Sequence, residues 1–383
     1  MDYNKLIKIS FFNYLSYFVR IYLVFFFENG YDIKSILLPV LVFLYGLFNL
    51  IGSYLYKKIG RTIDKKLKYL GFSTILFSSL YFICLILLFL TILLNIHYFC
   101  FLFILCLSSI FWGLSNNSYK QLLIKDDCKQ HFANYQIVKE LGYAIGLFVA
   151  GFIATISIPF TLLLGGFFVL TYNVALILLF KDKTPIIIEE KPNKNKNNVI
   201  DSRKYFRKEY IPILILFLII LIAWAEDNVS EYVINRIFEY PEIVFSIENI
   251  LIMVFSIIGI KIIQKLDIMQ GIIISFTFII INCILSGLML FSPEYNIILL
   301  SLSIGCIALG YSPIYSLTVP FLQKYMSDDH EIIAIDGIVT NIAATFSSML
   351  MLFLLINNVF LYFSFLIVIW IIVIIIKKYI KRV

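Results

Sequence analysis

Long apolar runs alternate with short polar joints along almost the whole sequence. Most runs hold about 20 residues, the length that an α-helix needs to cross the hydrocarbon core of a bilayer. Strands of a β-barrel would instead alternate strictly between apolar and polar residues, and no segment does so. The pattern predicts an all-α integral membrane protein with about twelve transmembrane helices, at residues 9–27, 35–56, 69–93, 98–118, 134–156, 159–180, 210–230, 242–260, 268–291, 296–317, 332–356 and 359–376.

Two apolar stretches are twice as long as one span. Each carries polar residues near its middle, at Asn95–His97 and at Asn357–Asn358. A single helix of that length would extend far beyond both faces of a bilayer. Each stretch therefore predicts a helical hairpin with a tight turn.

One long polar segment, residues 181–209, is rich in Lys and Asn and is typical of a flexible cytoplasmic linker. It separates a predicted six-helix bundle at residues 1–180 from a second at residues 210–383. A common shift of about 200 residues also pairs features of the two halves, such as Gly60 with Gly259, as expected for two parallel repeats.

The composition excludes several classes of protein. Hydrophobic residues make up 61% of the 383 residues and charged residues 14%, against about 45–50% and about 25% in soluble domains. A soluble fold could not cover so much apolar surface. A soluble enzyme, a disordered chain and a secreted disulfide scaffold are therefore excluded.

The basic residues predict how the chain lies in the membrane. All but four of the 31 Lys and Arg residues fall in joints on one side of the predicted spans. Lys34 and Arg236 fall on the other side, and Arg20 and Lys139 lie within spans. The positive-inside rule then predicts a multi-pass protein of the cell (inner or plasma) membrane with both termini in the cytoplasm. The net charge of +7 reports this topology and not a nucleic-acid partner.

A short segment after the second span combines small and charged residues. Gly60 is followed by Asp64, Lys65 and Lys68. A glycine permits close approach of helices, and an acid can accept hydrogen bonds from a helix N-terminus. The segment resembles the loop signature of the major facilitator superfamily, with Leu67 in place of a second glycine. The resemblance implies the major facilitator fold, two pseudo-symmetric six-helix bundles, and a loop that locks one conformer. A basic loop with an incidental acid is the alternative.

The fifth span carries small residues at Gly142, Gly146, Ala150 and Gly151. Small residues at this spacing line one face of a helix and allow close backbone packing, expected here against the opposite half. The segment resembles the fifth-helix motif of proton-coupled exporters in the same superfamily, with Leu147 in place of the proline. The resemblance implies proton-coupled export, and ordinary small-residue packing is the alternative.

Four charged residues within spans are candidates for binding substrate and protons: Arg20, Glu226, Asp227 and Glu248. An ionised side chain at the centre of a span costs about 2.5–3.5 kcal/mol on insertion scales, so it indicates function by default. In the superfamily the first and seventh spans line the central cavity, which implies that Arg20 faces acids across it. The alternative for Arg20 is a structural interhelical ion pair or snorkelling. Glu226 and Asp227 would lie in an exofacial loop if the seventh span ended early, and Glu248 could be interfacial.

Lys139, Glu140 and Asp336 lie near the cytoplasmic ends of the fifth and eleventh spans. We expect interfacial or gate ion pairs there, and solvated loop positions are the alternative. Asparagines within spans are expected to form hydrogen bonds between helices; they are Asn49, Asn116, Asn117, Asn173 and Asn282.

These features favour a secondary active transporter that works by alternating access. The leading hypothesis is proton-coupled export of a small amphipathic or cationic solute, drug-like or peptide-like, with the span acids binding proton and solute in turn. One alternative is an importer of a small anionic or polar nutrient with Arg20 as the anion-binding group. Another is a lipid flippase on the same fold. Aromatic residues on the cavity face would suit amphipathic solutes, but the sequence does not say which residues those are.

The sequence contains no phosphate-binding glycine loop, nucleophile elbow or zinc-protease motif. His131 and His330 each follow a pair of aspartates, but the spacings differ, and solvated loops explain them better than a metal site. We therefore expect no enzyme activity, no cofactor and no metal. The expected partners are a small-molecule substrate, protons and the lipid bilayer, with no nucleic acid, and we expect a monomer.

Overall fold

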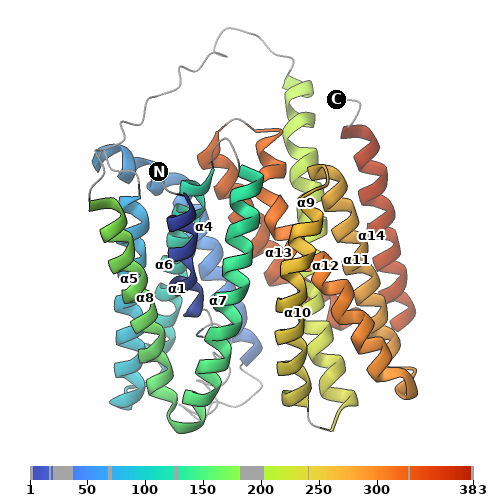
Figure 1. Cartoon of the computed structure of the whole chain (residues 1–383), viewed down its shortest axis with the longest axis horizontal. Coiled ribbons are helices and arrows are strands. Elements are labelled where there is room, and N and C mark those ends of the chain that lie inside the picture. Colours follow the sequence, from blue (N-terminus) through green and yellow to red (C-terminus); the bar gives the residue numbers. More distant parts are fainter. Residues whose placement is uncertain are drawn as a thin grey trace. The chain divides into compact units, whose positions relative to one another are not determined.

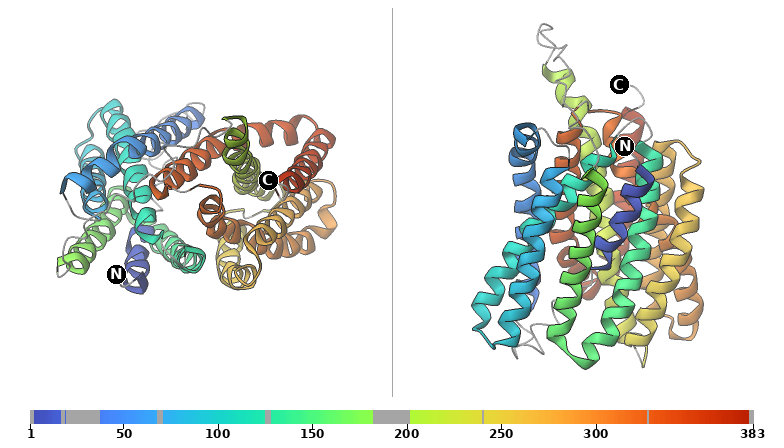
Figure 2. Two further views of the ribbon diagram at one scale, coloured as in Figure 1. Left: turned by 90° about the horizontal axis from the view of Figure 1, so that it is seen from above. Right: turned by 60° about the vertical axis from the view of Figure 1, so that its left-hand side comes forward.

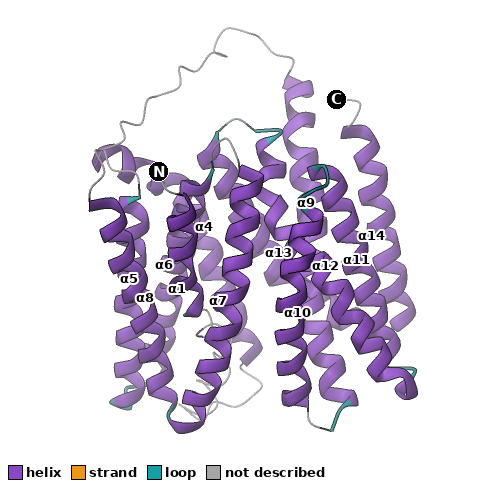
Figure 3. Cartoon of the chain, viewed as in Figure 1, coloured by secondary structure: helices purple, strands orange, loops and turns teal. Residues whose placement is uncertain are grey.

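Helices make up the computed structural model of the chain (Figures 1 and 3). The structure describes residues 3–16, 19, 38–67, 71–124, 128–181, 202–239, 241–326 and 328–380, and it contains no strand in those ranges. The helices are α1 (Tyr3–Leu15), α4 (Leu38–Leu67), α5 (Phe72–Leu93), α6 (Tyr98–Leu123), α7 (Cys128–Ile156), α8 (Ile158–Lys181), α9 (Ser202–Ile237), α10 (Pro241–Ile263), α11 (Ile268–Met289), the short 3₁₀ turn η2 (Pro293–Tyr295), α12 (Asn296–Gln323), α13 (Asp329–Asn357) and α14 (Val359–Ile380).

The chain divides into two compact units. The first unit comprises residues 1–126 and 138–193, and the second comprises residues 127–137 and 194–383. In the described residues the first unit holds α1, α4, α5, α6, α8 and most of α7, and the second holds α9 to α14. The view from above shows the helices of each unit nearly end-on (Figure 2). The fold is thus an all-α membrane fold of two pseudo-symmetric six-helix bundles.

Six of the described helices are long and apolar enough, by length and composition, to cross a membrane. They are Phe72–Leu93, Tyr98–Leu123, Pro159–Lys181, Ile268–Met289, Asn296–Gln323 and Val359–Lys377. Shorter apolar stretches run over Tyr210–Trp224 in α9 and Ile250–Ile263 in α10.

Both predicted hairpins are confirmed. Asn95 has a positive φ of 49°, which asparagine tolerates better than most residues, and it lies in the turn between α5 and α6. The turn between α13 and α14 is the single residue Asn358, whose side chain accepts a hydrogen bond from the backbone N–H of Leu361 at 3.1 Å. Polar residues that can hydrogen-bond the free backbone groups of a helix end thus mark both turns.

Several helices extend beyond the apolar runs. α4 continues through Leu67, so the segment from Gly60 to Leu67 is helical and not a loop. α9 begins at Ser202, so the last eight residues of the expected linker are helical as well. Hydropathy marks the membrane-spanning part of a helix, whereas Lys, Arg and Glu in water are good helix formers and extend it.

Glycines repeat one close helix crossing in both units. A Cβ atom added at Gly52 on α4 would collide with the carbonyl oxygen of Ile110 on α6. One added at Gly259 on α10 would collide with the carbonyl oxygen of Ala308 on α12. The second and fourth helices of each unit therefore touch backbone to backbone. By this contact the counterpart of Gly259 is Gly52, not Gly60 as the sequence shift suggested.

The first turns of α7, from Cys128 to residue 137, belong to the second unit and contact the end of α10. The ammonium group of Lys129 donates to the backbone carbonyls of Gln264 and Leu266, and the Gln264 side chain donates to that of Gln130. Helix ends leave carbonyls unsatisfied, and a lysine there satisfies them and complements the helix dipole. Burial lowers the pKa of Lys129.

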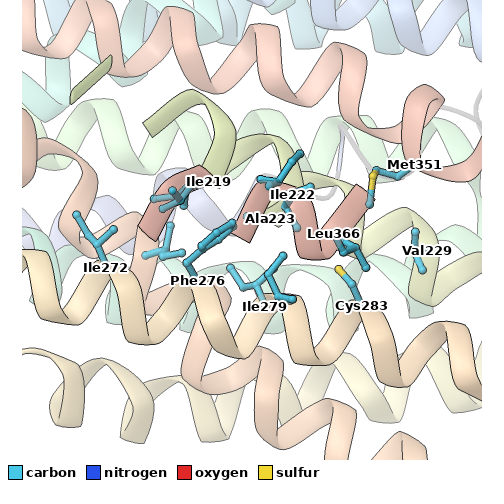
Figure 4. Packing of buried hydrophobic residues seen from close by; sticks show 14 of the residues in the cluster. Ile219, Ile222, Ala223, Val229, Ile272, Phe276, Ile279, Cys283, Met351 and Leu366 are labelled. Atoms are coloured by element: carbon cyan, nitrogen blue, oxygen red, sulfur yellow. The ribbon is translucent and has the colours of Figure 1, made fainter. Parts of the chain in front are cut away.

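The core of the second unit lies mainly among α9, α11, α12, α13 and α14. Ile219, Ile222, Phe276, Met351 and Leu366 pack together there (Figure 4). Asparagines within spans form hydrogen bonds between helices in both units, as the sequence led us to expect. In the second unit Asn282 accepts one from Ser303. In the first unit Asn173 accepts one from Ser78, and Asn117 donates one to Ser53.

Candidate functional site

A buried carboxyl group lies between the first two helices of the second unit. Glu248 on α10 is only 2% exposed, and the hydroxyl of Ser230 on α9 donates to its Oε1 at 2.7 Å. Glu248 is seven residues from the start of α10 and Ser230 seven from the end of α9, or about 10 Å from these helix ends. A carboxylate is costly to bury without compensating partners, so a buried carboxyl is a candidate for taking up a proton.

The other candidates for substrate binding are only partly described. Glu226 and Asp227 lie within α9, four and three residues before Ser230. Helical periodicity therefore places them on the helix face that carries Ser230. Their side chains, and the whole of Arg20, lie outside the described residues. The pairing of Arg20 with these acids remains a prediction.

Lys139 is part of a polar cluster on three helices of the first unit. Its ammonium group lies 5.9 Å from the centre of the Tyr14 ring on α1. The Tyr14 hydroxyl in turn donates to Oδ1 of Asn116 on α6 at 2.9 Å. Lys139 is half-buried, so a cation–π contact and a side-chain hydrogen bond connect α7, α1 and α6.

The two acids predicted near the gate are buried. Glu140 follows Lys139 on α7 and is 9% exposed, and Asp336 on α13 is 1% exposed. A solvated loop position is therefore wrong for both residues. The turns of helix at the start of α7 and α13 carry these acids into the packed bundle.

The small residues of α7 pack within the first unit. A Cβ atom at Gly142 would meet the carbonyl oxygen of Phe11, and one at Gly146 would collide with that of Leu15, both on α1. The expectation that these two glycines contact the opposite half is wrong, because α1 covers this face of α7. The surroundings of Gly151 lie outside the described residues.

The charged motif after the second span is described only in its backbone. Gly60, Asp64 and Lys65 lie in the last turns of α4, where their surroundings are not described, and Lys68 lies outside the described residues. A role for this motif as a conformational lock remains a prediction.

The aspartate and histidine pairs have structural contacts. Asp328 caps the N-terminus of α13 by accepting the backbone N–H of His330 at 3.0 Å, and His330 is buried. A solvated position is therefore wrong for His330. Among the described residues, no group of three or more His, Cys, Asp or Glu side chains could hold a metal ion.

Two aromatic contacts escaped the sequence analysis. Tyr14 on α1 meets Trp112 on α6 edge to face, with ring centres 6.1 Å apart. Trp224 on α9 meets Tyr315 on α12 in the same way at 6.4 Å. The sequence signal was a tryptophan or tyrosine deep within a span, but 17% of all residues are aromatic, which conceals such positions.

No protein-family model matches the sequence, and no curated protein matches it. Solved structures do resemble the fold. A proton:xylose symporter of the major facilitator superfamily, XylE, has a TM-score of 0.71 at 12% identity, with 98% of this chain and 94% of that chain covered. A bacterial homologue of the iron transporter ferroportin has a TM-score of 0.65 at 14% identity, covering 98% and 99%. The human organic anion transporter MFSD10 has a TM-score of 0.69 at 11% identity, covering 98% and 99%.

Each of these three structures is similar to nearly the whole of this chain. Their likeness agrees with the two six-helix bundles. The chain therefore has the fold of the major facilitator superfamily.

Proposed function

We propose that this protein is a proton-coupled secondary active transporter that exports a small amphipathic or cationic solute by alternating access. The fold is shared with transporters. The observation that supports proton coupling is the buried carboxyl of Glu248, which accepts a hydrogen bond from the Ser230 hydroxyl. A carboxyl within a bundle can exchange a proton when one face of the membrane has access to it, and it can attract a cation when it is ionised.

In this mechanism proton and solute compete for Glu248. The ionised carboxylate, with the Ser230 hydroxyl as donor, attracts the solute from the cytoplasm. Protonation from the outer side neutralises the carboxyl and releases the solute there. The proton then leaves on the cytoplasmic side after the bundles rock back. Glu226 and Asp227, on the same face of α9, are proposed to share this role, and Arg20 to adjust the proton affinity of the acids.

A second candidate is an importer of a small anionic or polar nutrient. The cluster of Lys139, Tyr14 and Asn116 favours it, because an ammonium and a side-chain amide are hydrogen-bond donors suited to an anion. Uptake of an anionic nutrient by whole cells that Lys139→Gln abolishes would support import over export.

The coupling is tested in proteoliposomes with an acidic interior and a trapped pH-sensitive dye. Ethidium added outside should raise the internal pH, because each cation that enters exchanges for a proton. We expect Glu248→Gln to slow this response at least tenfold, since the amide cannot bind and release a proton at neutral pH. Glu294→Gln is the matched control, because Glu294 is an exposed acid in η2 of the same unit.

Thermal stability of each variant is measured beside the transport rate, so that loss of folding is recognised. A folded Glu248→Gln protein with the wild-type proton response would remove Glu248 from the mechanism. A wild-type protein whose ethidium transport is indifferent to a protonophore would overturn proton coupling itself.

A further inference from the structure

Two aromatic pairs occupy equivalent positions in the two units. In the first unit Tyr14 on the first helix meets Trp112 on the fourth, with ring planes at 87°. In the second unit Trp224 on the first helix meets Tyr315 on the fourth, with ring planes at 76°. The same edge-to-face contact therefore joins the first and fourth helices in both units. The tryptophan lies on the fourth helix in the first unit and on the first helix in the second unit.

The two pairs differ in what covers them. Tyr14 and Trp112 are buried: the Lys139 ammonium lies over the Tyr14 ring, and Tyr81 packs on Trp112 with centres 5.2 Å apart. Trp224 and Tyr315 are both half-buried. In the first unit neighbouring side chains thus cover both rings of the pair. In the second unit part of the surface of both rings stays exposed.

A third ring extends the open pair. Tyr311, also half-buried, lies one helical turn from Tyr315 on α12, with ring centres 5.0 Å apart and planes at 64°. The indole Nε1 of Trp224 and the hydroxyl of Tyr315 are buried. The surface left open in this group is therefore mainly ring carbon. We call Trp224, Tyr311 and Tyr315 the aromatic platform.

The depth of the platform distinguishes it from a membrane anchor. Trp224 lies 13 residues before the end of α9 and Tyr311 lies 15 residues after the start of α12, about 20 Å and about 22 Å along these helices. The hydrocarbon core is about 30 Å thick, and tyrosines and tryptophans that anchor a protein lie at its two edges. Partly exposed tyrosine and tryptophan rings near the middle of the membrane therefore do not serve as interfacial anchors.

We infer that the aromatic platform binds a flat aromatic ring of the transported solute. Aromatic rings prefer edge-to-face and offset-stacked neighbours, and the platform already offers three rings in that relation. This inference rests on the proposed function and narrows its substrate class to amphipathic cations that carry an aromatic ring.

The test compares two organic cations of equal charge, tetraphenylphosphonium, which carries aromatic rings, and tetrabutylammonium, which carries none. Binding of each to the purified full-length protein is measured by equilibrium dialysis. We expect Trp224→Leu and Tyr315→Leu to weaken binding of tetraphenylphosphonium about tenfold, the scale of one lost aromatic contact. Binding of tetrabutylammonium should stay within about twofold of wild type, because an alkyl chain contacts leucine as well as it contacts a ring.

Two further variants separate the ring from other effects. Tyr315→Phe keeps the ring and should bind tetraphenylphosphonium as wild type does. Phe353→Leu removes an exposed ring on α13, a helix that carries no residue of the platform, and should change nothing. Tyr311→Leu provides a second truncation should either of the first two fail to fold.

The outcomes separate the platform from the proposed function. Unchanged tetraphenylphosphonium binding in folded Trp224→Leu and Tyr315→Leu proteins would overturn the inference that the platform binds the solute's ring. It would not contradict the proposed export of cations. Equal loss of both cations would also overturn it, because the effect would not depend on rings. A wild-type protein that binds neither cation would overturn the platform together with export of organic cations.

Discussion

At the residue scale, the surroundings of a side chain decide its chemistry, as Cys128 shows. This residue begins α7, is buried, and lies near the negative charge of Asp329. Burial first, and then Asp329, raise the pKa of its thiol to about 12. Because the thiolate is the reactive form, Cys128 should be inert at neutral pH.

We predict that a variant whose only cysteine is Cys128 reacts slowly with N-ethylmaleimide in detergent at pH 8. Roughly one thiol in ten thousand is ionised at that pH when the pKa is about 12. A variant whose only cysteine is the exposed Cys100 should react at least a hundredfold faster. Equal rates in the folded proteins would contradict the burial of Cys128, and denaturation should make the rates equal.

At the scale of helices, the repeated contact between second and fourth helices defines how each bundle packs. Gly259 provides it in the second unit, where the backbone of α12 leaves no room for a side chain. Gly305 lies on α12 itself, and a Cβ atom added there would have no neighbour within 4 Å. Gly259 and Gly305 thus form a matched pair on neighbouring helices: only at Gly259 would a side chain collide with the neighbouring backbone.

Gly259→Ala should destabilise the protein by about 1–3 kcal/mol, because overpacking forces the two helices apart. Gly305→Ala should be neutral or slightly stabilising, since alanine favours a helix more than glycine does. Thermal unfolding in one detergent checks both variants. A Gly259→Ala protein as stable as Gly305→Ala would show that α10 and α12 do not approach so closely.

At the scale of the whole molecule, the distribution of Lys and Arg predicts which way the chain faces. Cys100 follows the turn of the α5–α6 hairpin, on the side predicted to be outside. The segment 181–209 is predicted to be cytoplasmic and carries nine of the 31 Lys and Arg residues. These two positions report opposite faces of the membrane.

We predict that a membrane-impermeant maleimide labels a Cys100-only protein in intact cells. A cysteine introduced by Lys194→Cys, as the only cysteine, should be labelled only after the membrane is made permeable. Labelling of the two variants in the reverse order would invert the topology and, with it, the direction proposed for proton and solute.

Much of the fold follows from local features of the sequence. The apolar runs, the polar interruptions at Asn95 and Asn358 and the polar linker predict helices, hairpins and two halves without any tertiary information, because spanning length and turn chemistry are local properties. The same local signals misplaced the ends of α4 and α9, since a charged helix and a charged loop have the same hydropathy.

The sequence by itself determined that the chain is helical, lies in a membrane and forms two bundles of six helices. Only the tertiary structure decided which side of each helix meets which neighbour. It placed α1 against Gly142 and Gly146. It buried Glu248 beside Ser230. It also left Trp224 and Tyr315 partly exposed, whereas Tyr14 and Trp112 are buried. The reason is physical: in helices that are apolar on most sides, periodicity does not mark a buried face, and the partners that define it lie far away in the sequence.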